Sequence, residues 1–344
     1  MIDPVAEPRK EAEGRARPEK AEPGESFRPI FIVGSARSGT TMLAVMFDRH
    51  SRIAVPPETR FFFEYIPHMW PDGKPGSREE MVDRALAHEA TGSLGLEREE
   101  LLDQYSRYEP DFPNLLRAMI EVYARKRGKA RQGEKSPNHI ISVPLILRSF
   151  PTAKVICIYR DGRDSVLSMM RTPWMHANPR RFYLFCEHWI ESIEYMRRWE
   201  KMFTPSQFTC VRYCDLLSEP ERELRRLCEF VGEEFEPGQL DPGTKSEVVL
   251  ASEYDRRLKE KANQSVDNSR AAAWRTTATR EQIWALNSIL GATLRSLGYA
   301  DTLLKGCPLA TRIMLQIKRF PYLKPVRPYA HAAFRLKKRI FGGI

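Results

Sequence analysis

The sequence predicts an α/β fold in which helices cover both faces of a parallel sheet. Three observations support this prediction. Short, β-rich apolar runs alternate with amphipathic helical patterns along the chain. The first apolar run leads through a glycine-rich turn directly into a helix. The 344 residues, 42% of them hydrophobic, suffice for one large core, and no internal repeat divides them.

The elements follow in chain order. Four apolar runs predict buried strands, at residues 29–33, 53–55, 154–159 and 208–213. Helices are predicted over residues 40–50 and within 78–128, and another is opened by Asp164. A capping box at Ser218-x-x-Glu221 predicts a helix ending at Gly232, and a second box at Thr279-x-x-Gln282 predicts one ending at Gly298.

Composition divides the chain into three parts. Residues 1–26 are charged, proline-rich and free of aromatic residues, which predicts a disordered N-terminal tail. Residues 27–304 are predicted to form one domain. Residues 305–344 hold ten Lys or Arg and no acid, which equals the whole net charge of +10. The remaining chain is therefore formally neutral, and we expect no nucleic-acid partner.

The sequence predicts a cytoplasmic protein without a metal site. Its six cysteines form no C-x-x-C pair, which favours buried free thiols in a reducing compartment. Residues 1–26 carry acidic residues where a signal peptide needs an apolar run, and no stretch of about eighteen uncharged apolar residues occurs.

The turn after the first strand, Gly34-Ser35-Ala36-Arg37-Ser38-Gly39-Thr40-Thr41, has the context of a phosphate-binding loop. Backbone N–H groups and the helix N-terminus converge there on one point. The spacing Gly34-x-x-x-x-Gly39 is that of a P-loop, but Thr40 replaces the usual lysine and Arg37 supplies a cation instead. The alternative is a tight turn that needs glycine for steric reasons.

A second anion site is predicted where the 154–159 run ends. A nucleoside-triphosphate enzyme would place a metal-binding acid directly after such a strand. Here Arg160 comes first, and the hydroxyl of Ser168 follows eight residues later. The alternative is a solvated turn in which Arg160 and Arg163 pair with Asp161 and Asp164.

Together the two sites make residues 28–300 similar to PAPS-dependent sulfotransferases of the bacterial and tyrosylprotein-type branch. Arg37-Ser38-Gly39-Thr40-Thr41 resembles the family's loop for the 5′-phosphosulfate, and Arg160 with Ser168 resembles its 3′-phosphate pair. Further resemblances are Pro57-Glu58-Thr59-Arg60, the lysine-bearing Glu134-Lys135-Ser136-Pro137, Tyr213 and Leu297-Gly298-Tyr299. The cytosolic R-K-G signature is missing before Trp274-Arg275, which we assign to the nucleotide side, and His139 stands four residues after Lys135 rather than two.

The resemblance implies a P-loop-type fold that transfers a sulfuryl group from PAPS to a hydroxyl, less readily to an amine, and releases PAP. The acceptor class stays open among a small molecule, a glycan, a lipid and a peptide. Arg37, Lys135 and the loop amides would stabilise charge on the transferring group. Glu58 is the preferred base and His139 the alternative. Otherwise Glu58 would pair with Arg60, His139 would bond to backbone, and Lys135 would lie on the surface.

Two alternatives stay open. A small-molecule or nucleoside kinase on the same scaffold would need magnesium and a lysine at position 40, where this chain has Thr40.

In the C-terminal tail, apolar residues interleave with the ten cations. This pattern fits peripheral contact with an anionic membrane, or equally a helix packed on the domain with its charges solvated.

Overall fold

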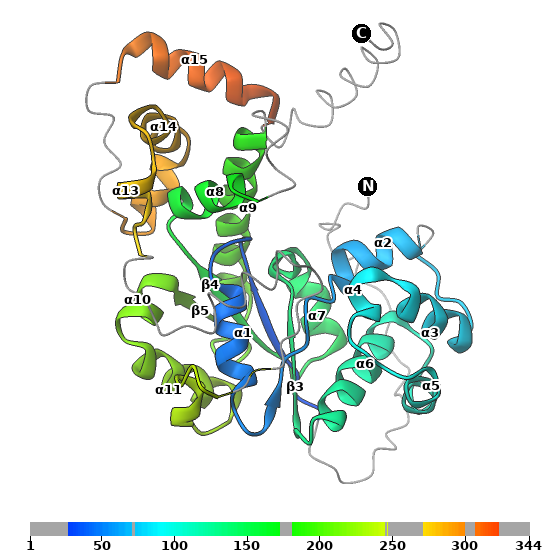
Figure 1. The fold of residues 1–344 in the computed structure, drawn as a ribbon. Coiled ribbons are helices and arrows are strands. Elements are labelled where there is room, and N and C mark those ends of the chain that lie inside the picture. Colours follow the sequence, from blue (N-terminus) through cyan, green and yellow to red (C-terminus); the bar gives the residue numbers. More distant parts are fainter. Residues whose placement is uncertain are drawn as a thin grey trace, which may run out of the picture.

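A five-stranded parallel sheet forms the centre of the structure, a computed structural model that describes residues 27–70, 73–172, 181–244, 246, 271–299 and 307–322 (Figure 1). The strand order is β2-β3-β1-β4-β5 and every pairing is parallel. The strands are β1 (Ile30–Gly34), β2 (Ile53–Ala54), β3 (Arg131–Lys135), β4 (Lys154–Tyr159) and β5 (Phe208–Arg212). The predicted α/β class is confirmed. The predicted N-terminal tail lies outside the described residues.

Strand β3 is the one that the apolar pattern did not predict. Its sequence, Arg-Gln-Gly-Glu-Lys, is charged, yet Arg131, Glu134 and Lys135 are buried. β3 fills the place between β1 and β2, with Ile32 of β1 opposite Lys135. Buried charges need partners, so a strand of this composition indicates that polar groups from other segments meet it.

Helices pack on both sheet faces, because successive β1 residues enter different apolar clusters. Ile30 and Ile32 join the side chains of α1 (Thr40–Asp48), α10 (Tyr213–Ser218) and α11 (Pro220–Val231). Phe31 and Val33 join those of α6 (Phe112–Lys126), α7 (Val143–Ser149) and α9 (Arg181–Met202). The remaining α-helices are α2 (Ile66–Met69), α3 (Arg78–Ala87), α4 (Glu89–Gly92), α5 (Arg98–Ser106), α8 (Gly162–Met170), α13 (Trp274–Thr277), α14 (Arg280–Ser296) and α15 (Leu309–Arg319).

The two predicted capping boxes have different outcomes. At α14, the Thr279 side chain accepts from the Gln282 N–H and the Gln282 side chain accepts from the Thr279 N–H, as predicted. The box at Ser218 is wrong. Ser218 ends α10 and its hydroxyl donates to the Asp215 carbonyl, while Pro220 opens α11 without a side-chain cap. In the described part of the chain, no helix has the length and apolarity to span a bilayer.

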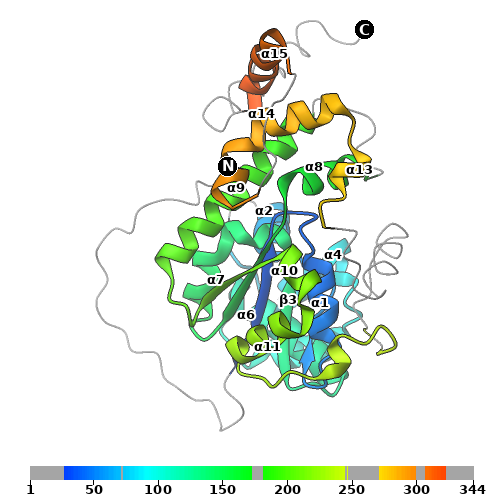
Figure 2. The same cartoon turned by 90° about the vertical axis from the view of Figure 1, so that its left-hand side faces the viewer.

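The carboxyl ends of the strands meet at one edge of the sheet. Gly34 ends β1, Lys135 ends β3 and Tyr159 ends β4, and the pairing registers hold these three neighbouring strands together. Helices α8, α13 and α14 stand beyond this edge together with the N-terminal end of α9, and α15 lies outside them (Figures 1 and 2). Ligands of open parallel sheets bind beyond such an edge, so the site is built here.

Candidate active site

The loop between β1 and α1 needs its two glycines. Gly34 has φ 153° and a Cβ there would lie 2.2 Å from the Ile158 carbonyl oxygen. Gly39 has φ 100° and a Cβ there would lie 2.5 Å from the Tyr213 ring. Arg37 adopts φ 66°, a left-handed conformation that costs free energy in a non-glycine residue and often marks a functional site. The loop therefore packs closely against β4 and α10, and any side chain larger than hydrogen at position 34 or 39 would prevent this packing.

Arg37 connects the loop to the second predicted anion site. Its Nε donates at 3.0 Å to the Oγ of Ser168, which lies in the last turn of α8. The neighbouring Ser38 hydroxyl is buried and lies 3.5 Å from the hydroxyl of Ser165 on the same helix. Two residues that the resemblance assigned to different phosphates, Arg37 and Ser168, are thus in direct contact.

Glu58 and Lys135 meet beside the loop. Lys135 Nζ lies 2.5 Å from Glu58 Oε1 and 3.5 Å from Thr41 Oγ1. The Lys135 side chain is fully buried, whereas that of Glu58 is 32% exposed. Arg60 pairs instead with Glu64 at 3.3 Å. Neither a surface lysine nor a Glu58–Arg60 pair is observed, and the Glu58 carboxylate stays accessible.

His139 lies in a different environment. The imidazole is fully buried, and its Nδ1 lies 2.9 Å from Glu134 Oε2. The Phe62 N–H donates to its Nε2 at 3.1 Å, so Nε2 carries no proton and Nδ1 donates to Glu134. Both ring nitrogens are therefore engaged. Glu134 also accepts from the hydroxyls of Thr59 at 2.8 Å and Ser136 at 2.6 Å.

The charge state of Glu134 follows from these contacts. Burial alone would raise the pKa of this fully buried carboxyl. His139 and the hydrogen bonds from His139, Ser136 and Thr59 outweigh burial and lower the pKa below its ordinary value. Glu134 is thus a fixed anion that joins β3 to the segment after β2.

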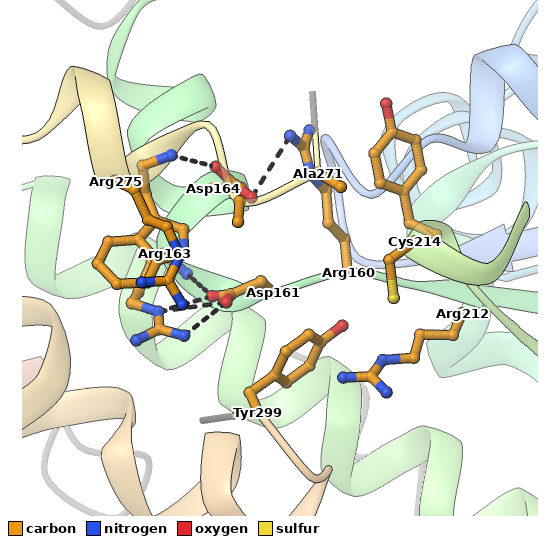
Figure 3. Close-up of a pocket in the computed structure, with 12 residues that line it drawn as sticks. Arg160, Asp161, Arg163, Asp164, Arg212, Cys214, Ala271, Arg275 and Tyr299 are labelled. Atoms are coloured by element: carbon orange, nitrogen blue, oxygen red, sulfur yellow. Dashed lines mark hydrogen bonds and ion pairs between the residues drawn. The ribbon is translucent and has the colours of Figure 1, made fainter. Parts of the chain in front are cut away.

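A cavity of about 170 Å³ lies beyond the ends of β4 and β5 (Figure 3). Its walls hold four arginines, two aspartates and three aromatic residues: Arg160, Arg163, Arg212, Arg275, Asp161, Asp164, Tyr213, Trp274 and Tyr299. Four of the predicted nucleotide-side residues, Arg160, Tyr213, Trp274 and Arg275, thus line one cavity. Arginines in excess over acids suit a phosphorylated ligand.

Arg160 lies just before the N-terminus of helix α8. Its guanidinium lies 4.5 Å from the centroid of the Tyr213 ring, and its Nη2 lies 3.6 Å from Asp164 Oδ2. Burial raises the pKa of Asp164, while Arg160 opposes the rise and Asp161 adds to it. The Arg–Asp pairs of the alternative do form, but Arg163 and both aspartates are buried and Arg160 is partly buried, so this is not a solvated turn.

Arg163 also lines the cavity. It is buried, pairs with Asp161 at 2.7 Å and lies 3.8 Å from the centroid of the Trp274 ring. The Trp274 Nε1 is buried and has no hydrogen-bond partner among the described residues. An unpaired buried donor on a cavity wall fits a polar group of a ligand. Sequence reasoning missed the cavity roles of Arg163 and Arg212, although both stand at or near strand ends.

A sequence model described as "Sulfotransferase family" matches residues 29–237, which is more than half of the chain. The chain belongs to the sulfotransferase family. This sulfotransferase is 28% identical to protein-tyrosine sulfotransferase 2 of Gallus gallus over 59% of its own length and 50% of the relative. It is 27% identical to an uncharacterised Aquifex aeolicus protein, over 63% of the chain and 26% of that protein. The chain thus spans half or less of these relatives' length.

Two solved structures share the fold of this sulfotransferase. The sulfotransferase domain of the curacin biosynthetic pathway matches with a TM-score of 0.54 at 20% identity, over 80% of this chain and 99% of that one. The sulfotransferase domain of the Synechococcus PCC 7002 olefin synthase matches with a TM-score of 0.52 at 22% identity, over 76% and 93%. At these identities the likeness establishes the fold alone.

Proposed function

We propose that this chain transfers the sulfuryl group of PAPS to an acceptor hydroxyl. The observation that carries the proposal is the Glu58–Lys135 pair, which stands beside the phosphate-binding loop with its carboxylate accessible. Family membership supports the reaction class. A kinase on this fold would use a lysine at position 40, and the chain has Thr40 there.

The residues present fit a doubly phosphorylated nucleotide. The loop amides with Arg37 suit one anionic group, and Arg160 with the other cavity arginines suits a second. The aromatic walls and the unpaired Trp274 indole N–H suit a base. When bound, PAPS supplies the activated sulfuryl group.

Each side chain of the pair then has a distinct task. Glu58 accepts the acceptor's proton as the new O–S bond forms and the S–O bond to PAP breaks. Lys135 and Arg37 stabilise the negative charge on the sulfuryl and bridging oxygens. Lys135 contacts Glu58 in this structure. Lys135 would turn toward the nucleotide when it binds, and the Glu58 carboxylate would then be free to accept a proton.

The acceptor is a hydroxyl compound, and a tyrosine-containing peptide is the first to test. The support is the similarity to protein-tyrosine sulfotransferase 2 and the P-E-T-R segment around Glu58. Small phenols, glycans and lipids with free hydroxyls complete a panel, and an amine tests the less favoured chemistry.

Nucleotide binding tests the proposal before any acceptor is known. PAP should bind without magnesium and more tightly than ATP–Mg in isothermal titration calorimetry. Arg160→Ala should weaken PAP binding by about 1.5–3 kcal/mol, because a bound phosphate loses a charged partner.

Arg225→Ala is the matched control, since Arg225 is an exposed arginine of α11 that pairs with Glu221 and does not line the cavity. Its PAP affinity should equal that of the parent protein. Preference for ATP–Mg would favour the kinase, and an Arg160→Ala variant with undiminished PAP affinity would overturn the assignment of the cavity.

A further inference from the structure

Helix α15 carries apolar side chains on two different sides. One side, marked by the half-buried Thr311, Leu315 and Arg319, faces the domain. The other side bears Leu309, Ile313 and Ile317, and Phe320 follows directly after the helix. These four side chains are 53–70% exposed. At 100° per residue these four fall within about one quarter of the helix circumference. They form an apolar stripe that points away from the domain.

Two residues of α15 fix the helix to the body by polar contacts. Gln316 Nε2 donates to the Ser288 carbonyl at 3.2 Å and to its hydroxyl at 3.1 Å, on α14. Arg319 Nε donates to Glu187 of α9 at 2.5 Å. In both views α15 lies at the outer end of the molecule, at the opposite end from α11 (Figures 1 and 2). The docked helix therefore holds its apolar stripe outward.

The exposed charges of α15 have one sign. Arg312 and Lys318 are exposed on α15, and the helix contains no acid. Residues 323–344 add six Lys or Arg and again no Asp or Glu. A second copy of this region would bring cations against cations. An anionic surface complements the cations while covering the apolar stripe.

We propose that the α15 stripe, Leu309, Ile313, Ile317 and Phe320, inserts into the interface of an anionic membrane. Amphipathic helices with Lys or Arg on the polar face and large apolar residues on the other bind such surfaces. Nearby cations add attraction to anionic headgroups, and salt screens that attraction. The inference is independent of the sulfuryl-transfer proposal.

Vesicle flotation of the full chain tests the proposal. Vesicles of phosphatidylcholine with about 30% phosphatidylserine are compared with pure phosphatidylcholine at about 0.15 M salt, near physiological ionic strength. We expect binding to the anionic vesicles, weakened by high salt. A double variant, Ile313→Glu with Ile317→Glu, should bind at least about tenfold more weakly, because it loses apolar contact and gains repulsion.

Met202→Glu is the matched control, because Met202 is 53% exposed at the C-terminal end of α9, outside α15. It should bind like the parent chain, and the double variant should keep its melting temperature because both positions are exposed. Equal binding by the double variant would show that α15 is not the surface, and equal binding to neutral vesicles would exclude the anionic partner. A dimer in sedimentation equilibrium that the double variant dissociates, with no flotation, would assign the stripe to a second copy.

Discussion

Two pairs of side chains, each containing one glutamate, lie back to back at the end of β3. Glu134 meets His139, and the adjacent Lys135 meets Glu58. Successive strand residues point to opposite faces, and the adjacent Glu58 and Thr59 divide in the same way, since Thr59 donates to Glu134. Neighbouring residues of β3, Glu134 and Lys135, therefore point into two different environments.

The two pairs differ in their exposure to solvent and in how many of their polar atoms have hydrogen-bond partners. Glu134 and His139 are fully buried, and every ring nitrogen and carboxylate oxygen of the pair has a partner. The Glu58 side chain is 32% exposed, and its partner Lys135 lies 3.5 Å from Thr41 Oγ1, directly after the loop. A saturated pair suits structure, and an accessible pair suits proton transfer. We expect substitutions to separate the two roles.

The largest effect on stability is expected from Glu134→Ala. It leaves a buried imidazole and two buried hydroxyls without their acceptor, so the free energy of unfolding should fall by about 3–5 kcal/mol. Urea unfolding measures it. If the alanine variant fails to fold, Glu134→Gln is measured instead. Glutamine keeps the volume of the side chain but cannot accept all three hydrogen bonds that Glu134 accepts. An unchanged midpoint in both would contradict a structural role.

Lys135→Met should lower kcat by about 10²–10³, as removal of a charge-stabilising donor does in other enzymes. Initial rates with PAPS at saturating acceptor measure it. Lys129→Met is the control, since Lys129 pairs with Asp48 at the other end of β3. A Lys135→Met variant with parental kcat would place the lysine outside the chemistry.

His139→Asn should affect stability more than rate. Loss of the ring removes contacts with Glu134 and the Phe62 N–H, which we expect to cost about 1–3 kcal/mol. The kcat of the folded variant should stay within a few-fold of the parent. A severe kcat loss with an unchanged melting temperature would move the base to His139.

Acid should reduce the contribution of Glu134 to the stability of the fold. Its folded-state pKa lies below the ordinary 4.5. The stabilisation by Glu134 is therefore fully present above about pH 4.5 and is lost as the pH falls through the lowered folded-state pKa. Melting temperatures from pH 6 to 3 should fall less steeply in Glu134→Gln. Parallel curves would mean that Glu134 is not the stabilising anion.

How far the sequence could predict this site depends on which signals are local. Gly34 to Thr41 and Arg160 with Ser168 stand directly after apolar runs, so local pattern places them at strand ends. Strand β3 escapes prediction because its burial depends on partners supplied by residues 58–59 and 231–233, far away in sequence. The same dependence hides the saturation of His139, which one backbone N–H from Phe62 completes. The Arg163–Trp274 contact likewise joins α8 to a helix more than one hundred residues later.

The most direct test of the account is the kcat of Glu58→Gln beside its affinity for PAP. Glutamine keeps the size of the side chain but cannot accept the acceptor's proton, so kcat should fall by about 10²–10⁴. PAP affinity should stay near that of the parent, and Glu64→Gln, which alters the carboxylate that pairs with Arg60, should leave kcat unchanged. A Glu58→Gln variant that transfers sulfuryl groups at nearly the parental rate would contradict the account and leave Glu58 as an anchor for Lys135.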